Sequence, residues 1–186
     1  MGQYYKCVIL AEKPADDKEY IRTHVNPHVY HEGAKLVEHS YCNTGFMRAV
    51  EMLLRKGGVH YKSRVVWAGD YADVEPGHGN NLNNSIGEND PGFTGVGCPY
   101  DHTFIINHTK KEYVVKMNAL HPLPLLTAEG NGRGGGDYHG ADEDLVGTWA
   151  RDVISVEMEA PADYTMLVHS FGEPSAQRRA ASPSTP

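Results

Sequence analysis

The spacing of hydrophobic positions predicts one clear helix in the first third of the chain. Its apolar residues recur at i, i+4, i+7 and i+8 on one helical face, at Phe46, Val50, Leu53 and Leu54. Asn43 or Thr44 can cap the first turn, and Gly57-Gly58 can end the helix with a left-handed residue. Glu51 and Arg55 are spaced for an ion pair on the exposed side of this helix.

Short runs of β-branched and aromatic residues predict the strands of a sheet. The runs lie at residues 4–11, 64–68 and 152–157, with a hairpin formed by 103–107 and 112–115. Weaker patterns predict a short strand within 35–41 and a strand at 164–168 that pairs with 152–157. The two prolines of residues 121–124 predict an extended segment that continues to 128, since proline fixes φ and biases its predecessor away from helix.

These elements together predict an α+β fold, in which an antiparallel-rich sheet carries one principal helix. Residues 12–33 and 69–101 are polar and lack periodicity, so they predict long loops, the second of which is either functional or an insertion. Residues 1–171 form a single predicted domain. The composition of residues 172–186 falls to Pro, Ser, Ala, Arg and Gln, which predicts a disordered tail.

Composition and charge narrow the classes of function. Hydrophobic residues make up 40% of the chain and charged residues 22%, as in an ordinary globular domain. A formal net charge of -7 argues against general binding to duplex DNA, which needs a surplus of Lys and Arg. The three cysteines form no CxxC pair, so neither a disulfide framework nor a zinc ribbon is expected. Because no signal peptide or membrane span is recognisable, we expect a cytoplasmic protein without a membrane partner.

A glycine-rich segment, residues 129–138, is the most unusual feature of the chain. Five of its seven positions from 130 to 136 are glycine, so its backbone N–H groups are free to turn inward and bind an anion. Arg133 adds a guanidinium suited to phosphate or carboxylate. The segment is neither a Walker loop nor a dinucleotide fingerprint. The competing interpretation is a tight surface loop without a ligand.

The function predicted from these residues is binding of a small anionic ligand, a nucleotide or a derivative of one. The segments 67–73, 121–124 and 129–138 are expected to converge at one edge of the sheet. The predicted ligand-binding residues are Arg133, Gly134, Gly135, Gly136, Asp137, Tyr138, His121, Glu129 and Tyr71. Tyr71 or Tyr138 would stack on a base, and Asp137 would accept hydrogen bonds from ribose hydroxyls. Flanking prolines would hold His121 rigidly before the glycine-rich segment.

Two alternative functions stay open at this stage. The first is a metal-dependent hydrolase that uses Asp70, Asp73 and His121, with Glu129 as the general base. The second is an interaction protein without enzymatic activity, in which the glycine-rich segment only shapes a docking surface. The sequence does not decide whether the protein is an enzyme, and it identifies no cofactor and no oligomeric state.

Several blocks of the chain carry a resemblance to a known group of proteins. The blocks are Met1-Gly2-Gln3-Tyr4-Tyr5-Lys6, residues 66–73, residues 107–114 and residues 121–138. They resemble a family of uncharacterised phage and microbial proteins that begin with Met-Gly-x-Tyr-Tyr-Lys. The resemblance extends to about Val156 and implies that these blocks belong to one design. It implies no activity and no catalytic residue.

Overall fold

The computed structural model describes residues 3–11, 20–97, 103–130, 138–169 and 171. The strands are β1 Tyr5–Leu10, β2 Ile21–Val25, β3 Ser63–Gly69, β4 Phe104–Asn107, β5 Glu112–Val115, β6 Ala128–Glu129, β7 Val153–Glu157 and β8 Thr165–Met166. The helices are α1 Leu36–His39, α2 Gly45–Leu54 and α3 Pro122–Leu126, with 3-10 helices at Pro27–Tyr30 (η1), Lys116–Asn118 (η2) and Glu143–Leu145 (η4). The predicted tail, 172–186, lies outside the described residues.

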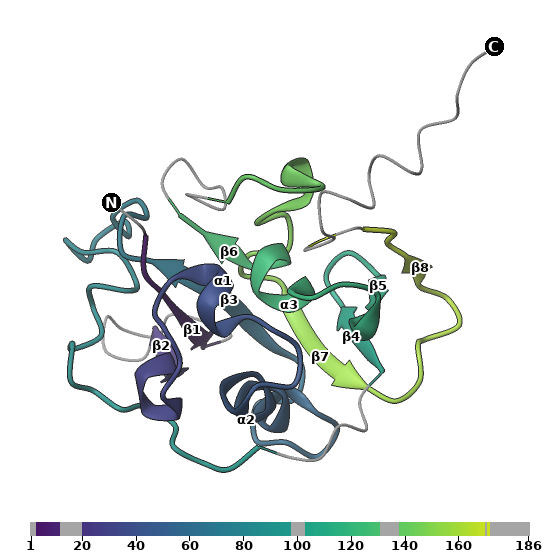
Figure 1. The fold of residues 1–186 in the computed structure, drawn as a ribbon, viewed down its shortest axis with the longest axis horizontal. Coiled ribbons are helices and arrows are strands. Elements are labelled where there is room, and N and C mark those ends of the chain that lie inside the picture. Colours follow the sequence, from purple (N-terminus) through teal and green to yellow (C-terminus); the bar gives the residue numbers. More distant parts are fainter. Residues whose placement is uncertain (1–2, 12–19, 98–102, 131–137, 170, 172–186) are drawn as a thin grey trace.

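One mixed but mostly antiparallel sheet organises the molecule (Figure 1). Seven of its eight strands follow the order β2-β1-β3-β7-β4-β5-β8, and the eighth, β6, pairs with β3 beside this path. Two pairs in the sheet are parallel, β3 with β6 and β5 with β8, and the others are antiparallel. The antiparallel-rich sheet predicted from the sequence is therefore confirmed.

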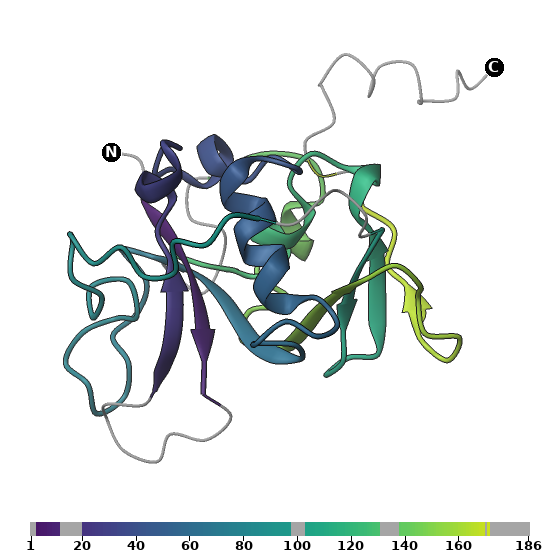
Figure 2. The ribbon, with the colours of Figure 1, turned by 90° about the horizontal axis from the view of Figure 1, so that it is seen from below.

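The two faces of the sheet are covered by different kinds of structure. Tyr5, Cys7 and Ile9 of β1 pack toward α2, which crosses the middle of one face in Figure 2. The alternate residues Val8 and Leu10 point to the other face, as strand geometry requires. There they meet Leu82 and Ile86 from the segment that follows β3. That segment, predicted as a loop or insertion, thus closes a second, smaller core.

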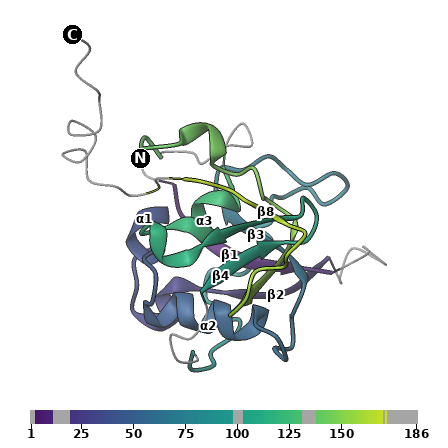
Figure 3. The ribbon, with the colours of Figure 1, turned by 90° about the vertical axis from the view of Figure 1, so that its right-hand side faces the viewer.

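The structure describes three α-helices, of which two lie where extended chain was expected. α1 and α3 lie side by side (Figure 3). α3 begins with Pro122 directly after His121, because the first turn of a helix needs no N–H from proline. In α1 the Glu38 carboxylate accepts from the Lys35 N–H at 3.0 Å, which caps the first turn.

The predicted helix near residue 46 matches α2, but one of its polar residues was placed wrongly. Thr44 caps the helix by accepting from the Met47 N–H at 3.2 Å. Glu51 is not on the exposed side, since its side chain is 2% exposed and pairs with the equally buried Lys116 at 3.0 Å. A residue from η2, far along the chain, therefore replaces the local partner Arg55 that helix spacing suggested.

Two strands also differ from the prediction. β2 lies inside the segment predicted to be a loop, where its polar residues, such as Thr23 and His24, suit a strand at the edge of the sheet. β8 pairs in parallel with β5, through Glu112 and Thr165, and does not pair with β7. Strand pairing was not readable here because β8 has only two residues.

A buried histidine joins α1 to the sheet. His39 has no exposed surface, and its Nε2 accepts from the indole N–H of Trp67 at 2.9 Å. Because indole only donates, the ring proton of His39 lies on Nδ1 and is donated to the Gly33 carbonyl at 3.0 Å. Burial lowers the pKa of His39 to about 4.

This geometry predicts a loss of stability in mild acid. The unfolded chain protonates His39 near its ordinary pKa, whereas the folded protein resists until about pH 4. The contribution of His39 is therefore complete above about pH 6.5 and falls by up to roughly 1.4 kcal/mol per pH unit below it. Urea unfolding of wild type and His39→Gln between pH 7.5 and 4 measures it. The wild type should lose its advantage as the pH falls, and a pH-independent difference would contradict the assignment.

Candidate functional site

A charged cluster around Arg151 connects four distant parts of the chain. The guanidinium Nε donates to the Glu129 carboxylate at 2.7 Å. Its Nη2 donates to the other oxygen of Glu129 at 2.6 Å, and also to Glu75. Its Nη1 donates to Glu75 at 3.0 Å and to the Tyr20 hydroxyl at 2.7 Å. The Tyr20 hydroxyl in turn donates to Glu75 at 3.1 Å. All five N–H donors of Arg151 are therefore used.

The electrostatics of the cluster follow from partial burial and pairing. Burial acts to raise the pKa of Glu75, but the hydrogen bonds and charge of Arg151 outweigh it, and the pKa is lowered. Burial opposes the charged form of Arg151 as well, yet Glu129 and Glu75 raise its pKa.

Arg151 also adopts a left-handed backbone, with φ 66°, which costs a residue with a side chain about 1 kcal/mol or more. The hydrogen bonds of the guanidinium hold this conformation in place.

Beside this cluster lies the first cavity, of about 470 Å³, which we call the carboxylate cavity. It is lined by Tyr20, Asp73, Val74, Glu75, Pro76, Glu129, Gly147, Ala150 and Arg151. Asp73, Glu75 and Glu129 line this cavity together with one cation, Arg151, whose donors are already committed to Glu75, Glu129 and Tyr20. The wall therefore offers mainly hydrogen-bond acceptors, which suit the hydroxyl and amine groups of a ligand.

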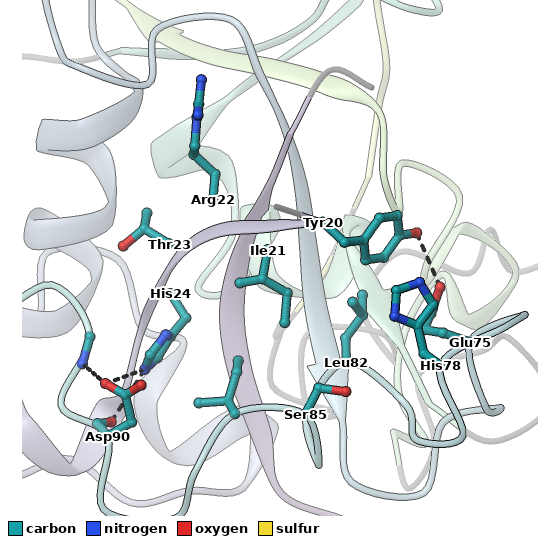
Figure 4. Close-up of a pocket in the computed structure, with 12 residues that line it drawn as sticks. Tyr20, Ile21, Arg22, Thr23, His24, Glu75, His78, Leu82, Ser85 and Asp90 are labelled. Atoms are coloured by element: carbon teal, nitrogen blue, oxygen red, sulfur yellow. Dashed lines mark hydrogen bonds and ion pairs between the residues drawn. The ribbon is translucent and has the colours of Figure 1, made fainter. Parts of the chain in front are cut away.

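A second cavity, of about 550 Å³, follows the edge strand β2 and is called the edge-strand cavity (Figure 4). Figure 4 shows Tyr20, His78 and Glu75 gathered at one end, and His24 and Asp90 turned toward each other at the other end. Tyr20 and Glu75 line both cavities, so the two spaces adjoin along this pair.

Asparagine side chains position the segment that forms the walls of both cavities. Asn81 donates to the carbonyls of Asp70, at 2.9 Å, and Ala72, at 3.0 Å. Asn83 donates to the carbonyl of Ala68 at 2.8 Å. These amides bind backbone groups where β3 ends, which is why a segment without periodicity still has a defined path.

The structure brings together only some of the predicted site residues. Glu129 and Asp73 meet in the carboxylate cavity, as the expected convergence of their segments requires. Asp70 instead accepts from the Tyr4 N–H at 3.0 Å, and Tyr71 is half-exposed beside it. Neither residue lines the carboxylate cavity.

His121 and Tyr138 have other partners. His121 is 4% exposed, and its Nδ1 lies 2.5 Å from the Ser40 hydroxyl, with the Tyr41 ring packed 4.2 Å away. It lines neither the carboxylate cavity nor the edge-strand cavity. Tyr138 donates to the Ala141 carbonyl at 3.0 Å. The other predicted ligand-binding residues, Arg133, Gly134, Gly135, Gly136 and Asp137, lie outside the described residues.

Sequence reasoning missed three residues that dominate the site: Tyr20, Glu75 and Arg151. Tyr20 and Arg151 are separated by 131 positions, and Glu75 and Arg151 by 76. No motif connects them, and each is an ordinary residue in its own segment. Only knowledge of which strands pair in the sheet would have indicated that these three residues lie together, and a single sequence does not give that pairing.

The described part of the chain offers no preformed metal centre. Within residues 3–11, 20–97, 103–130, 138–169 and 171, no group of three or more His, Cys, Asp or Glu side chains is placed to hold a metal ion. Nor does any helix in these ranges have the length and apolar character needed to cross a membrane. Protein-family models, curated proteins and solved structures give no match to this chain.

Proposed function

We propose that this protein binds a small anionic ligand of the nucleotide class, with the ribose of the ligand in the carboxylate cavity. One observation carries the proposal. Glu129, the first residue of the glycine-rich segment, lines the same cavity as Asp73 from the segment after β3. The sequence selected both segments for unusual composition, independently of each other. Their meeting in one cavity supports a shared ligand.

The chemistry of the walls supports this division of the ligand. Ribose hydroxyls are donors, and the carboxylates of Asp73 and Glu129 would accept from them. A phosphate would be repelled by the same carboxylates, so it belongs on the side of the predicted anion site. That role stays a prediction for Arg133 and the glycines 134–136.

The metal-dependent hydrolase is the weaker candidate. Asp70 already accepts a backbone hydrogen bond, and His121 is occupied by Ser40. Asp73 lines a cavity in which the remaining acidic groups bind Arg151. No described contact favours a docking surface for a protein partner over ligand binding. The proposal is therefore one of binding, without an assigned reaction.

Isothermal titration calorimetry with nucleosides, nucleotides and inorganic phosphate tests the proposal. Wild type should bind nucleotides more tightly than the matching nucleosides. Arg133→Ala should remove that advantage, and Asp73→Ala should weaken nucleosides and nucleotides alike. Lys56→Ala, which removes an exposed charge after α2, is the matched control and should change nothing. Failure to bind any nucleoside or nucleotide, or affinities unchanged by both variants, would overturn the proposal.

A further inference from the structure

We infer that the edge-strand cavity holds the base of this ligand, and that Asp90 selects a base with two adjacent N–H donors, as on guanine. The inference rests on the proposed function, because it assigns the remaining part of the same nucleotide. The two cavities share Tyr20 and Glu75, so a single ligand can pass from one to the other. The base would then lie on the side away from Glu129.

The middle of the edge-strand cavity suits a flat ring. Its floor contains Ile21, Leu82 and Ile86, the last two of which belong to the smaller core beneath. Tyr20 and His78 close one end, with ring centroids 5.2 Å apart and the rings tilted by 36°. Aliphatic and aromatic side chains bury the faces of a base without demanding hydrogen bonds from them. The polar groups that read a base then have to contact its edge.

Asp90 provides such a group at the opposite end. Its Oδ1 accepts from the Gly92 N–H at 3.0 Å and lies 3.6 Å from His24 Nε2. Among the described residues, the contacts of this carboxylate fall on Oδ1, which leaves Oδ2 open. The side chain is 54% exposed, so a ligand can reach it. Asp90 therefore presents an oriented carboxylate that forms no ion pair with Lys or Arg among the described residues, although the charge of Lys6 acts on it.

The backbone around Asp90 is fixed by its neighbours. The Asp90 carbonyl lies 3.2 Å from His24 Nε2 and accepts from the Asn26 amide at 3.4 Å. Gly92 has a positive φ of 59°, and a Cβ at this position would collide with the His24 carbonyl. These contacts hold the carboxylate against β2 before any ligand binds. A preorganised acceptor of this kind discriminates between donor patterns.

An ionised carboxylate only accepts, and its two oxygens match two neighbouring N–H groups. Guanine offers such a pair along one edge, its ring N–H and its exocyclic amine. Hypoxanthine keeps the ring N–H but lacks the amine. Adenine places a ring acceptor beside its amine, and this acceptor would face the carboxylate. Asp90 should therefore rank the three bases in the order guanine, hypoxanthine, adenine.

Calorimetric titration with the monophosphates of guanosine, inosine and adenosine tests the inference. Wild type should bind the guanosine nucleotide roughly 5- to 150-fold more tightly than the adenosine nucleotide, the range expected for one good bidentate contact. Inosine monophosphate should fall between them. Asp90→Asn should remove this ranking. Asp73→Ala, which removes an equal charge from the carboxylate cavity, should weaken all three ligands and keep the ranking.

The outcomes separate this inference from the proposed function. Equal binding of the three nucleotides by wild type would overturn the role of Asp90 while nucleotide binding itself stands. A ranking that survives Asp90→Asn would do the same. Failure to bind any of the three would overturn the proposed function and this inference together. The wild-type ranking needs no variant, so a folding defect in Asp90→Asn cannot hide the answer.

Discussion

Replacing Arg151 with Met should lower the free energy of unfolding by about 3–5 kcal/mol at pH 7. The substitution leaves Glu75 and Glu129 partly buried, side by side and without their cation, and it removes five hydrogen bonds. Arg151 lowers the pKa of Glu75 in the wild type, so the stability that this carboxylate contributes is present near neutral pH and lost in acid. The deficit of the variant should therefore shrink as the pH falls toward 4.

Urea unfolding at pH 7 and pH 4 measures both parts of this expectation. Lys56→Met removes a cation from an exposed position and is the control, with an expected change below about 0.5 kcal/mol. A loss of less than about 1 kcal/mol for Arg151→Met would show that the cluster is a surface feature. A stability loss that grows as the pH falls would show that the loss does not come from the unpaired carboxylates of Glu75 and Glu129.

The second large effect is expected at the buried pair of Glu51 and Lys116. Both side chains are 2% exposed, and the Lys116 ammonium lies 3.0 Å from the carboxylate of Glu51 on α2. Lys116→Met leaves the Glu51 carboxylate without its cation in the core, which should cost about 3–5 kcal/mol. The double variant Glu51→Leu/Lys116→Met replaces the pair by apolar groups and should recover most of this loss.

Thermal and urea unfolding of the two single variants and the double variant form a double-mutant cycle. The predicted result is a coupling energy of a few kcal/mol, because each single variant strands its partner. Additive losses, in which the double variant is the least stable, would show that the two charges do not depend on each other. The cycle also tests the burial of Glu51, which the spacing of residues along the helix did not indicate.

Sequence patterns predicted correctly those elements whose apolar residues within one segment all face the core. The spacing of Phe46, Val50 and Leu53 gave α2, because all three side chains enter the same core under the sheet. The same spacing misled for Glu51, since position along a helix does not reveal that a lysine from η2 reaches that face. The proline pair at 122 and 124 favoured extended chain, yet both prolines fit the first turn of α3.

The candidate site was predictable only where composition was unusual. Asp73 and Glu129 stood out because of the segments that contain them, and both line the carboxylate cavity. Arg151 and Tyr20 did not stand out. They belong to the site because they are hydrogen-bonded to each other, and 131 positions separate them in the sequence. His121 was predicted to be a site residue because its neighbouring prolines make it rigid. In the structure it precedes α3 and contacts Ser40, so rigidity did not indicate a binding role.

A crystal structure of the protein with guanosine monophosphate is the most direct test of the central claim. The account predicts that the base lies in the edge-strand cavity with its edge at the Asp90 carboxylate, and the ribose beside Tyr20 and Glu75. A nucleotide bound in a third cavity, of about 740 Å³ beside Tyr4 and Lys6, would contradict it. So would crystals grown at saturating nucleotide in which both predicted cavities contain only water.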